Sequence, residues 1–174
     1  DAPENILSVG CSTGEECKSL SELYFKDSKI TGLDFVDKII KSNIAKNNNP
    51  NINYITVSQA LSSDMKYNLI FAMSVLCLWD IGPKNDPIKW EGTYPHTTFT
   101  ETLDVIDSFL AVGGYLCIYN SQYIFSETEL YKNKYTSIDT KQKESGCVTK
   151  YSLNTSKPTP ISGPYPYVLF QKQK

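Results

Sequence analysis

Residues 8–16 read SVGCSTGEE and directly follow a short apolar run. That run predicts a buried strand over residues 6–9, and the two acidic residues suit the first turn of a helix capped by Ser12 or Thr13. Glycines and small side chains between a strand and a helix let the backbone approach a ligand closely. The stretch therefore predicts a strand, a tight ligand-binding turn and a helix.

The same order of strand and helix recurs along the chain. Apolar residues at helical spacing predict the buried faces of two helices, namely Cys17, Leu20, Leu23 and Tyr24 in the first and Val36, Ile39, Ile40 and Ile44 in the second. Apolar and β-branched runs predict strands over residues 6–9, 29–35, 52–57, 67–73 and 115–119. The alternation predicts an α/β fold with a mostly parallel sheet and helices on both faces.

The second half of the chain contains two capping-box patterns and a pair of closing strands. Thr98 with Glu101 and Ser126 with Glu129 predict the starts of two further helices, the first ending at the glycines 113 and 114. Residues 147–153 and 167–170 predict two strands joined by a proline-rich loop. We expect this pair to close the sheet as an antiparallel hairpin.

Length and composition exclude several classes of protein. The 174 residues suit a single domain over 1–174, and because the chain opens at its first strand we expect that it lacks a preceding N-terminal segment. The apolar runs are too short for a membrane span and no leader opens the chain, so we expect a cytoplasmic protein. The net charge of -2 predicts no general nucleic-acid binding.

Cysteine and histidine usage argues against a metal site or a disulfide framework. The five cysteines include no C-x-x-C pair, and His96 is the single histidine. Structural zinc needs four such ligands at suitable spacing, so we expect no metal.

The glycine pattern of residues 10–15 also decides between two ligands. A dinucleotide fingerprint needs glycine where this chain has Ser12 and Glu15. A carboxylate in the first helical turn repels a pyrophosphate, but it is compatible with a cofactor that carries an ammonium and a sulfonium. The carboxylate of such a cofactor could bind the backbone N–H groups. We therefore predict S-adenosylmethionine as the cofactor.

Further cofactor contacts are expected where the first four strands end. Asp34 closes the second strand, where an acid accepts the hydroxyls of a ribose. Ser58 and Gln59 could reach the adenine edge. The full predicted set is Gly10, Cys11, Ser12, Gly14, Glu15, Asp34, Phe35, Ser58, Gln59, Ala72, Met73 and Ser74.

Three stretches carry a resemblance to a known family. SVGCSTGEE resembles motif I of the class I S-adenosylmethionine methyltransferases, in particular the chemotaxis receptor (CheR-type) enzymes, whose signature contains GCSTGEE. YNLIFAMSVLCLW (67–79) resembles their FDLIFCRNVLIYF, and VGGYLCIYNSQ (112–122) is similar to their PGGYLFLGHSE. The resemblance implies a Rossmann-like, seven-stranded methyltransferase fold. It also implies cofactor contacts at Gly10, Ser12, Gly14, Glu15, Asp34 and Ser74.

The chain departs from that family where the methyl acceptor would bind. Met73 and Ser74 stand in place of arginine and asparagine, and Leu78 stands in place of a tyrosine near the methyl-transfer site. The resemblance therefore implies the same cofactor, but it does not imply that the methyl acceptor is a receptor glutamate.

Candidate catalytic groups flank a long connection, residues 80–96, that is rich in glycine, proline and aromatic residues. We expect Trp90 and Tyr94 to cover the substrate. Methyl transfer depends mainly on alignment, and an amine or hydroxyl acceptor also needs a base. The candidate bases are His96, Asp80 and Tyr119.

The sequence thus predicts a methyltransferase that acts on a small molecule or a protein side chain. The first alternative is a catalytically inactive methyltransferase-like domain that serves as a cofactor-binding or protein-interaction module. A dinucleotide-dependent oxidoreductase comes third, because Glu15 opposes a pyrophosphate.

Overall fold

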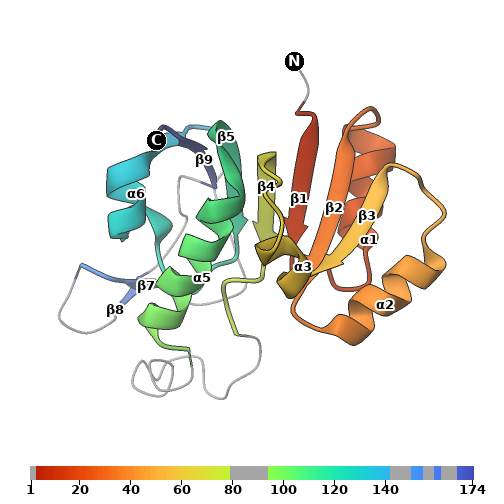
Figure 1. The fold of residues 1–174 in the computed structure, drawn as a ribbon. Helices are drawn as coiled ribbons and strands as arrows, with labels where there is room; N and C mark the ends of the chain where they lie inside the picture. Colours follow the sequence, from red (N-terminus) through yellow and green to blue (C-terminus); the bar gives the residue numbers. More distant parts are fainter. Residues whose placement is uncertain (1–2, 79–93, 142–149, 155–158, 162–167) are drawn as a thin grey trace.

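The computed structural model describes residues 3–78, 94–141, 150–154, 159–161 and 168–174. Seven strands form one sheet in the order β3-β2-β1-β4-β5-β9-β6 (Figure 1). They are β1 Asn5–Val9, β2 Lys29–Asp34, β3 Ile52–Thr56, β4 Tyr67–Met73, β5 Leu110–Tyr119, β6 Tyr135–Ile138 and β9 Leu169–Lys172. Strands β1 to β5 are parallel, and β9 runs antiparallel to β5 and β6. The predicted Rossmann-like fold, a mostly parallel seven-stranded sheet with an antiparallel C-terminal hairpin, is confirmed.

Helices cover both faces of this sheet (Figure 1). One face carries α1 Glu15–Ser19, the π-helical η1 Leu20–Tyr24 and α2 Asp37–Lys46. The other carries α3 Val57–Leu61, α5 His96–Phe109, the 3-10 turn η2 Phe125–Glu127 and α6 Glu129–Lys134. Neighbouring strand residues alternate between the two cores, as Ile6 and Leu7 do, because successive side chains point to opposite faces.

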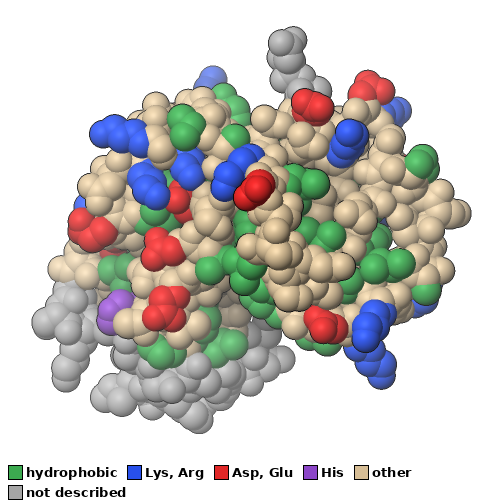
Figure 2. Space-filling view, in the orientation of Figure 1, with side chains coloured by type: hydrophobic (Ala, Val, Ile, Leu, Met, Phe, Trp, Pro, Cys, Tyr) green, Lys and Arg blue, Asp and Glu red, His purple; other side chains and the backbone are tan. Residues whose placement is uncertain are grey.

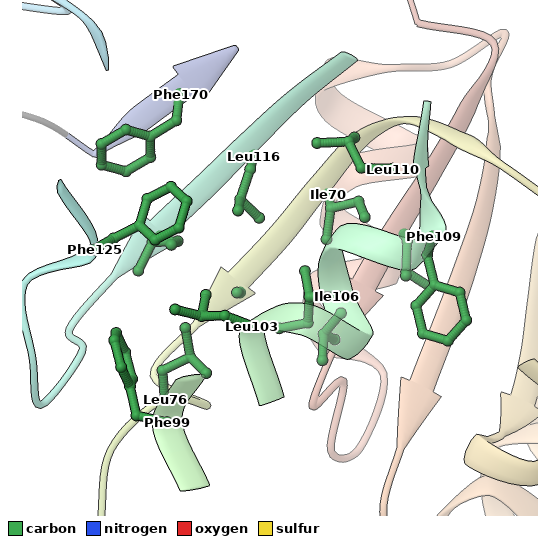
Figure 3. Packing of buried hydrophobic residues seen from close by; sticks show 14 of the residues in the cluster. Ile70, Leu76, Phe99, Leu103, Ile106, Phe109, Leu110, Leu116, Phe125 and Phe170 are labelled. Carbon is green, nitrogen blue, oxygen red and sulfur yellow. The ribbon is translucent and has the colours of Figure 1, made fainter. Parts of the chain in front are cut away.

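The larger core lies between α5 and the centre of the sheet. Phe99 and Leu103 of α5 are fully buried and belong to the same cluster as Ile70 of β4 and Leu116 of β5 (Figure 3). The helical spacing of the α5 side chains places them on one face, so their burial holds the helix across β4 and β5.

A buried ion cluster attaches α5 to the C-terminal hairpin. The Asp107 carboxylate lies 2.7 Å from Lys134 Nζ and 2.9 Å from Lys172 Nζ, and it accepts a 2.7 Å hydrogen bond from the Tyr135 hydroxyl. Burial opposes ionisation of Asp107, but these three hydrogen bonds outweigh it and lower its pKa. The cluster therefore joins a helix to both antiparallel strands through one carboxylate that bonds to two ammonium groups and a hydroxyl.

The first two helices differ from their predicted form. Gly14, in the left-handed conformation, is the N-cap of α1, and neither Ser12 nor Thr13 caps the helix. The helix then widens into η1, which turns Leu23 and Tyr24 outward, to 67% and 71% exposure. The predicted apolar face was therefore wrong in its second half.

The predicted stripe of α2 is only partly buried. Ile40 is buried, but Val36 and Ile44 are half exposed. The buried polar residue Asn43 takes a position on the inner face of the helix.

Both predicted capping boxes were wrong. Helix α5 begins at His96 after Pro95, with no side-chain cap. Helix α6 is capped by the Thr128 hydroxyl, which accepts from the Tyr131 N–H at 3.1 Å, and Ser126 lies in η2 instead. Thr128 has the extended backbone that an N-cap needs, whereas Ser126 lies inside the 3-10 turn.

The glycines expected to end the long helix lie inside a strand. Helix α5 stops at Phe109 and β5 starts at Leu110, while Gly113 has φ +81° where the register of β4 against β5 shifts. Glycine accommodates this bulge because it has no Cβ.

The closing hairpin contains one of the two predicted strands, because β9 corresponds to the predicted 167–170 strand, but its partner is not the predicted 147–153 strand. β6, Tyr135–Ile138, pairs with β9. Within the described part of the predicted 147–153 strand, β7 Lys150–Ser152 pairs with β8 Thr159–Ile161 in a separate two-stranded sheet. Only four residues of mixed polarity form β6, so no apolar run marked it.

The described surface carries charges of both signs. Figure 2 shows lysine and acidic side chains close to one another on the face formed by α5 and α6. Among the described residues, no helix has the length and apolar character that crossing a bilayer requires.

Candidate functional site

The strand order reverses between β1 and β4, which is where open α/β sheets bind ligands. The loop after β1 meets the segment after β4 at this point. A Cβ added to Gly10 would lie 2.7 Å from Val75 Cγ2, which is closer than real Cβ contacts. Gly10 is therefore required for the loop to pack against the end of β4.

The loop alternates through left-handed backbone, with φ of +69° at Gly10, +45° at Ser12 and +85° at Gly14. Its amides are used within the protein. The N–H groups of Gly10 and Cys11 donate to the Leu33 carbonyl, at 2.8 and 3.0 Å, and that of Gly14 donates to the Cys11 carbonyl at 2.9 Å. These three amides thus stabilise the loop and are not available to a ligand carboxylate in this arrangement.

Asp34 connects this loop to the second helix. Its Oδ2 accepts from the Ser12 N–H and its Oδ1 from the Val36 N–H, both at 2.9 Å, and the side chain is 8% exposed. Each carboxylate oxygen keeps a second lone pair for a further donor. The acid predicted to bind ribose therefore also positions the loop.

Asn43 is a loop contact that the sequence reasoning missed. Its Nδ2 donates to the Ser12 carbonyl at 2.7 Å from a buried position on α2. A polar residue three positions after Ile40, on the inner face of a helix, was the available signal.

The two acidic residues of the motif have different surroundings. Glu15 is exposed at the start of α1, whereas Glu16 accepts a 2.6 Å hydrogen bond from Ser8 Oγ near the carboxyl end of β1. Burial raises the pKa of Glu16, and the Ser8 hydrogen bond opposes that rise. Cys11 is buried, with its side chain in the same apolar cluster as Cys17.

An exposed aromatic ring, Phe35, follows β2, and the capped helix α3 follows β3. Phe35, next to Asp34, is 57% exposed. The Gln59 side-chain Oε1 accepts from the Thr56 N–H at 2.9 Å in the capping box of α3, and Ser58 Oγ lies 3.0 Å from Thr56 Oγ1. In this arrangement both predicted adenine contacts bond to Thr56.

The ends of β4 and β5 are linked through Ser74. Its N–H donates to the Tyr119 carbonyl at 2.9 Å, and its Oγ accepts from Asn120 Nδ2 at 3.1 Å. Ser74 and Asn120 both have left-handed backbone, with φ of +60° and +59°. Of the two preceding residues, Met73 is half-buried and Ala72 packs in the larger core.

The three candidate bases have separate positions. Tyr119 is half-buried at the end of β5, beside Ser74. His96 is exposed as the first residue of α5. Asp80 lies outside the described residues, as does Trp90 of the expected cover. Tyr94 is 9% exposed and its ring stacks on Tyr123, so it belongs to the core rather than to a lid.

The described surface includes a groove and a smaller pocket. A groove of about 710 Å³ is lined by Pro3, Asn68, Gly113 and their neighbours, at the amino ends of the strands and opposite the predicted site. A smaller pocket of about 190 Å³ adjoins the loop and is lined in part by Gly14 and Tyr54. Among the described residues, no cluster of histidine, cysteine or acidic side chains could hold a metal ion.

Comparisons with known proteins give structural similarity only. No family model and no curated protein matches the chain. The plantazolicin methyltransferase BpumL, in complex with a monoazolic desmethylPZN analog and SAH, is 22% identical over 68% of this chain, with a TM-score of 0.48. The CurJ carbon methyltransferase is 19% identical over 72% of this chain, with a TM-score of 0.48. PKMT2 from Rickettsia typhi is 17% identical over 66% of this chain, with a TM-score of 0.45.

The chain spans 39%, 31% and 20% of the length of these three proteins, in the same order. The assignment of the fold therefore rests on the strand order and register of the chain itself.

Proposed function

We propose that the chain is a class I S-adenosylmethionine-dependent methyltransferase that modifies a small molecule or a protein side chain. The observation that carries this proposal is the Asp34 carboxylate, which is bonded to the Ser12 N–H of the loop after β1 and lies beside the point where the strand order reverses. An acid at that position accepts the hydroxyls of a ribose.

The residues around the loop fit this cofactor chemically. The second lone pairs of Asp34 would accept the ribose hydroxyls, and the exposed ring of Phe35 would stack on the adenine. Glu15 would attract the ammonium group, and Ser74 would contact the methionine portion. Ser58 and Gln59 would approach the adenine edge if their bonds to Thr56 rearrange.

The acceptor side combines the ends of β4 and β5 with the start of α5. The bound cofactor supplies a methyl group on a sulfonium, which a lone pair of the acceptor displaces in line. Tyr119 and His96 would accept a proton from an amine or hydroxyl, and Asp80 is a third candidate. The resemblance to the chemotaxis receptor enzymes supports the cofactor site, while Met73, Ser74 and Leu78 favour a different acceptor.

We place this activity in a single cytoplasmic domain without general nucleic-acid binding. Cys11 and Cys17 are unpaired thiols buried in the smaller core, which suits a reducing compartment. The small net charge of -2 supports an acceptor other than a phosphate backbone.

Calorimetric titration with S-adenosylmethionine and S-adenosylhomocysteine tests the proposal. Binding by the wild type that Asp34→Ala abolishes, and that the exposed-acid control Asp37→Ala retains, is the expected result. Equal binding by both variants would contradict the site. Binding by the wild type without turnover over a broad panel of acceptors would favour the inactive module.

A further inference from the structure

One aromatic ring lies against two glycines from different elements. A Cβ added to Gly14 would be 2.3 Å from the Tyr54 hydroxyl oxygen, and one added to Gly32 would be 2.7 Å from its Cδ1. Tyr54 stands directly opposite Gly32 in the β2–β3 register. The ring therefore occupies the volume that side chains at residues 14 and 32 would fill.

The Tyr54 ring is held firmly at this position. Tyr54 is 8% exposed and shares the smaller core with Cys17, whose Sγ would also lie 2.9 Å from a Cβ on Gly32. Burial raises the pKa of Tyr54 to about 12, so the phenol is neutral at physiological pH. Tyr54 acts here through its shape and not through a charge.

Tyr54 contacts Gly14 at the residue where the loop ends and α1 begins. Gly14 donates its N–H to the Cys11 carbonyl at 2.9 Å, and its own carbonyl accepts from the Lys18 N–H at 3.0 Å. Gly14 thus closes the turn of residues 11–14 and also begins α1. A shift of Gly14 would move both the turn and the first helical residues.

We propose that Tyr54 is a positioning residue for the cofactor loop, because its ring and hydroxyl set the distance between Gly14 and the sheet. This inference rests on the proposed function, since the loop is the one assigned to S-adenosylmethionine. Asp34 and Asn43 hold Ser12 by hydrogen bonds, and Tyr54 supports the other end of the loop from β3.

Hydrogen exchange of the Gly14 amide, in protein without added ligand, tests this role directly. Tyr54→Leu removes the ring and should speed that exchange by about tenfold, the factor that corresponds to about 1.4 kcal/mol of local opening. Tyr54→Phe keeps the ring but removes the hydroxyl that faces Gly14, so it should speed the exchange by less than Tyr54→Leu does. Tyr67→Leu removes a tyrosine of the other core, buried to a similar extent, and controls for general loss of stability.

A second measurement covers the case in which Tyr54→Leu is poorly folded. Gly14→Ala should cost less stability in the Tyr54→Phe background than in the wild type, because the clash with the hydroxyl is gone. Unchanged Gly14 exchange in Tyr54→Leu, or strict additivity in this double-mutant cycle, would overturn the proposal.

Titration of the same variants with S-adenosylhomocysteine separates this inference from the proposed function. Tyr54→Leu should weaken binding by about tenfold while Tyr67→Leu does not. A wild type that binds no cofactor would refute the proposed function, and the exchange comparison would still decide whether Tyr54 positions the loop.

Discussion

Two regions at the carboxyl edge of the sheet use left-handed backbone, and they achieve it with different residues. After β1 the outer positions of the loop are glycines, Gly10 and Gly14, with φ of +69° and +85°. At the ends of β4 and β5 the left-handed residues are Ser74 and Asn120, whose side chains hydrogen-bond to each other at 3.1 Å. Glycine adopts this backbone without steric cost, whereas other residues need compensation from their surroundings.

A left-handed position is recognisable in the sequence when it is occupied by glycine, but not when it is occupied by a residue such as Ser74 or Asn120. Gly10 and Gly14 also lack a side chain because Val75 and Tyr54 occupy that space. Ser74 and Asn120 keep theirs, and Asn120 is 1% exposed. The first region therefore adopts left-handed backbone at residues that have no side chain, and the second at residues whose side chains hydrogen-bond to each other.

The largest effect is expected from Gly14→Ala. Left-handed backbone and the contact at 2.3 Å with the Tyr54 hydroxyl should together cost about 3 kcal/mol in urea unfolding. Gly113→Ala is a matched control, because Gly113 has a similar φ of +81° but no atom within 4 Å of the added Cβ. It should cost about 1 kcal/mol. Equal costs would mean that backbone conformation alone, and not Tyr54, requires glycine at position 14.

Asp34→Ala should have the next largest effect, because it leaves the N–H groups of Ser12 and Val36 without their acceptor. We expect a stability loss of about 2 kcal/mol, together with loss of cofactor binding. Denaturant unfolding and calorimetry measure the two effects, with Asp37→Ala as the control. A stable variant that still binds cofactor would remove Asp34 from both roles.

Replacement of Asn120 tests the second of the two left-handed regions. Asn120→Ala loses the bond to Ser74 and keeps a Cβ in left-handed backbone, for an expected cost of about 1.5 kcal/mol. Asn120→Gly loses the bond but relieves the backbone, so its cost in urea unfolding should be smaller. If the alanine variant proves at least as stable as the glycine variant, the left-handed backbone at residue 120 stores no strain.

The smallest effect concerns Glu16, the acid of the motif that bonds to Ser8. Burial raises its pKa above the ordinary 4.5, so its protonated form is favoured by folding. The associated stability is fully present below pH 4.5 and is lost as the pH rises through the raised pKa. The Tm of Glu16→Gln relative to the wild type should therefore increase from acidic to neutral pH. A difference that is constant with pH would show that Glu16 titrates alike in the folded and unfolded chain.

Local patterns predicted much of the parallel half of the molecule. Strand β4, Tyr67–Met73, was predicted to the residue, because a continuous apolar run is typical of a strand covered on both faces. The helix ends were predicted poorly, since several adjacent serine, threonine and acidic residues satisfy a capping pattern. The choice between Ser126 and Thr128 as cap depends on which of them has extended backbone.

The sequence by itself determined the α/β class, the glycine turn after β1 and Asp34 at the end of β2, because apolar periodicity and the absence of side chains are local properties. Only the tertiary structure decided which distant residues meet there. It brought Tyr54 against Gly14, Asn43 against Ser12 and Asn120 against Ser74. It also selected β6 as the partner of β9. These contacts depend on strand order and register, since residues far apart in the chain come together only when the whole sheet has formed.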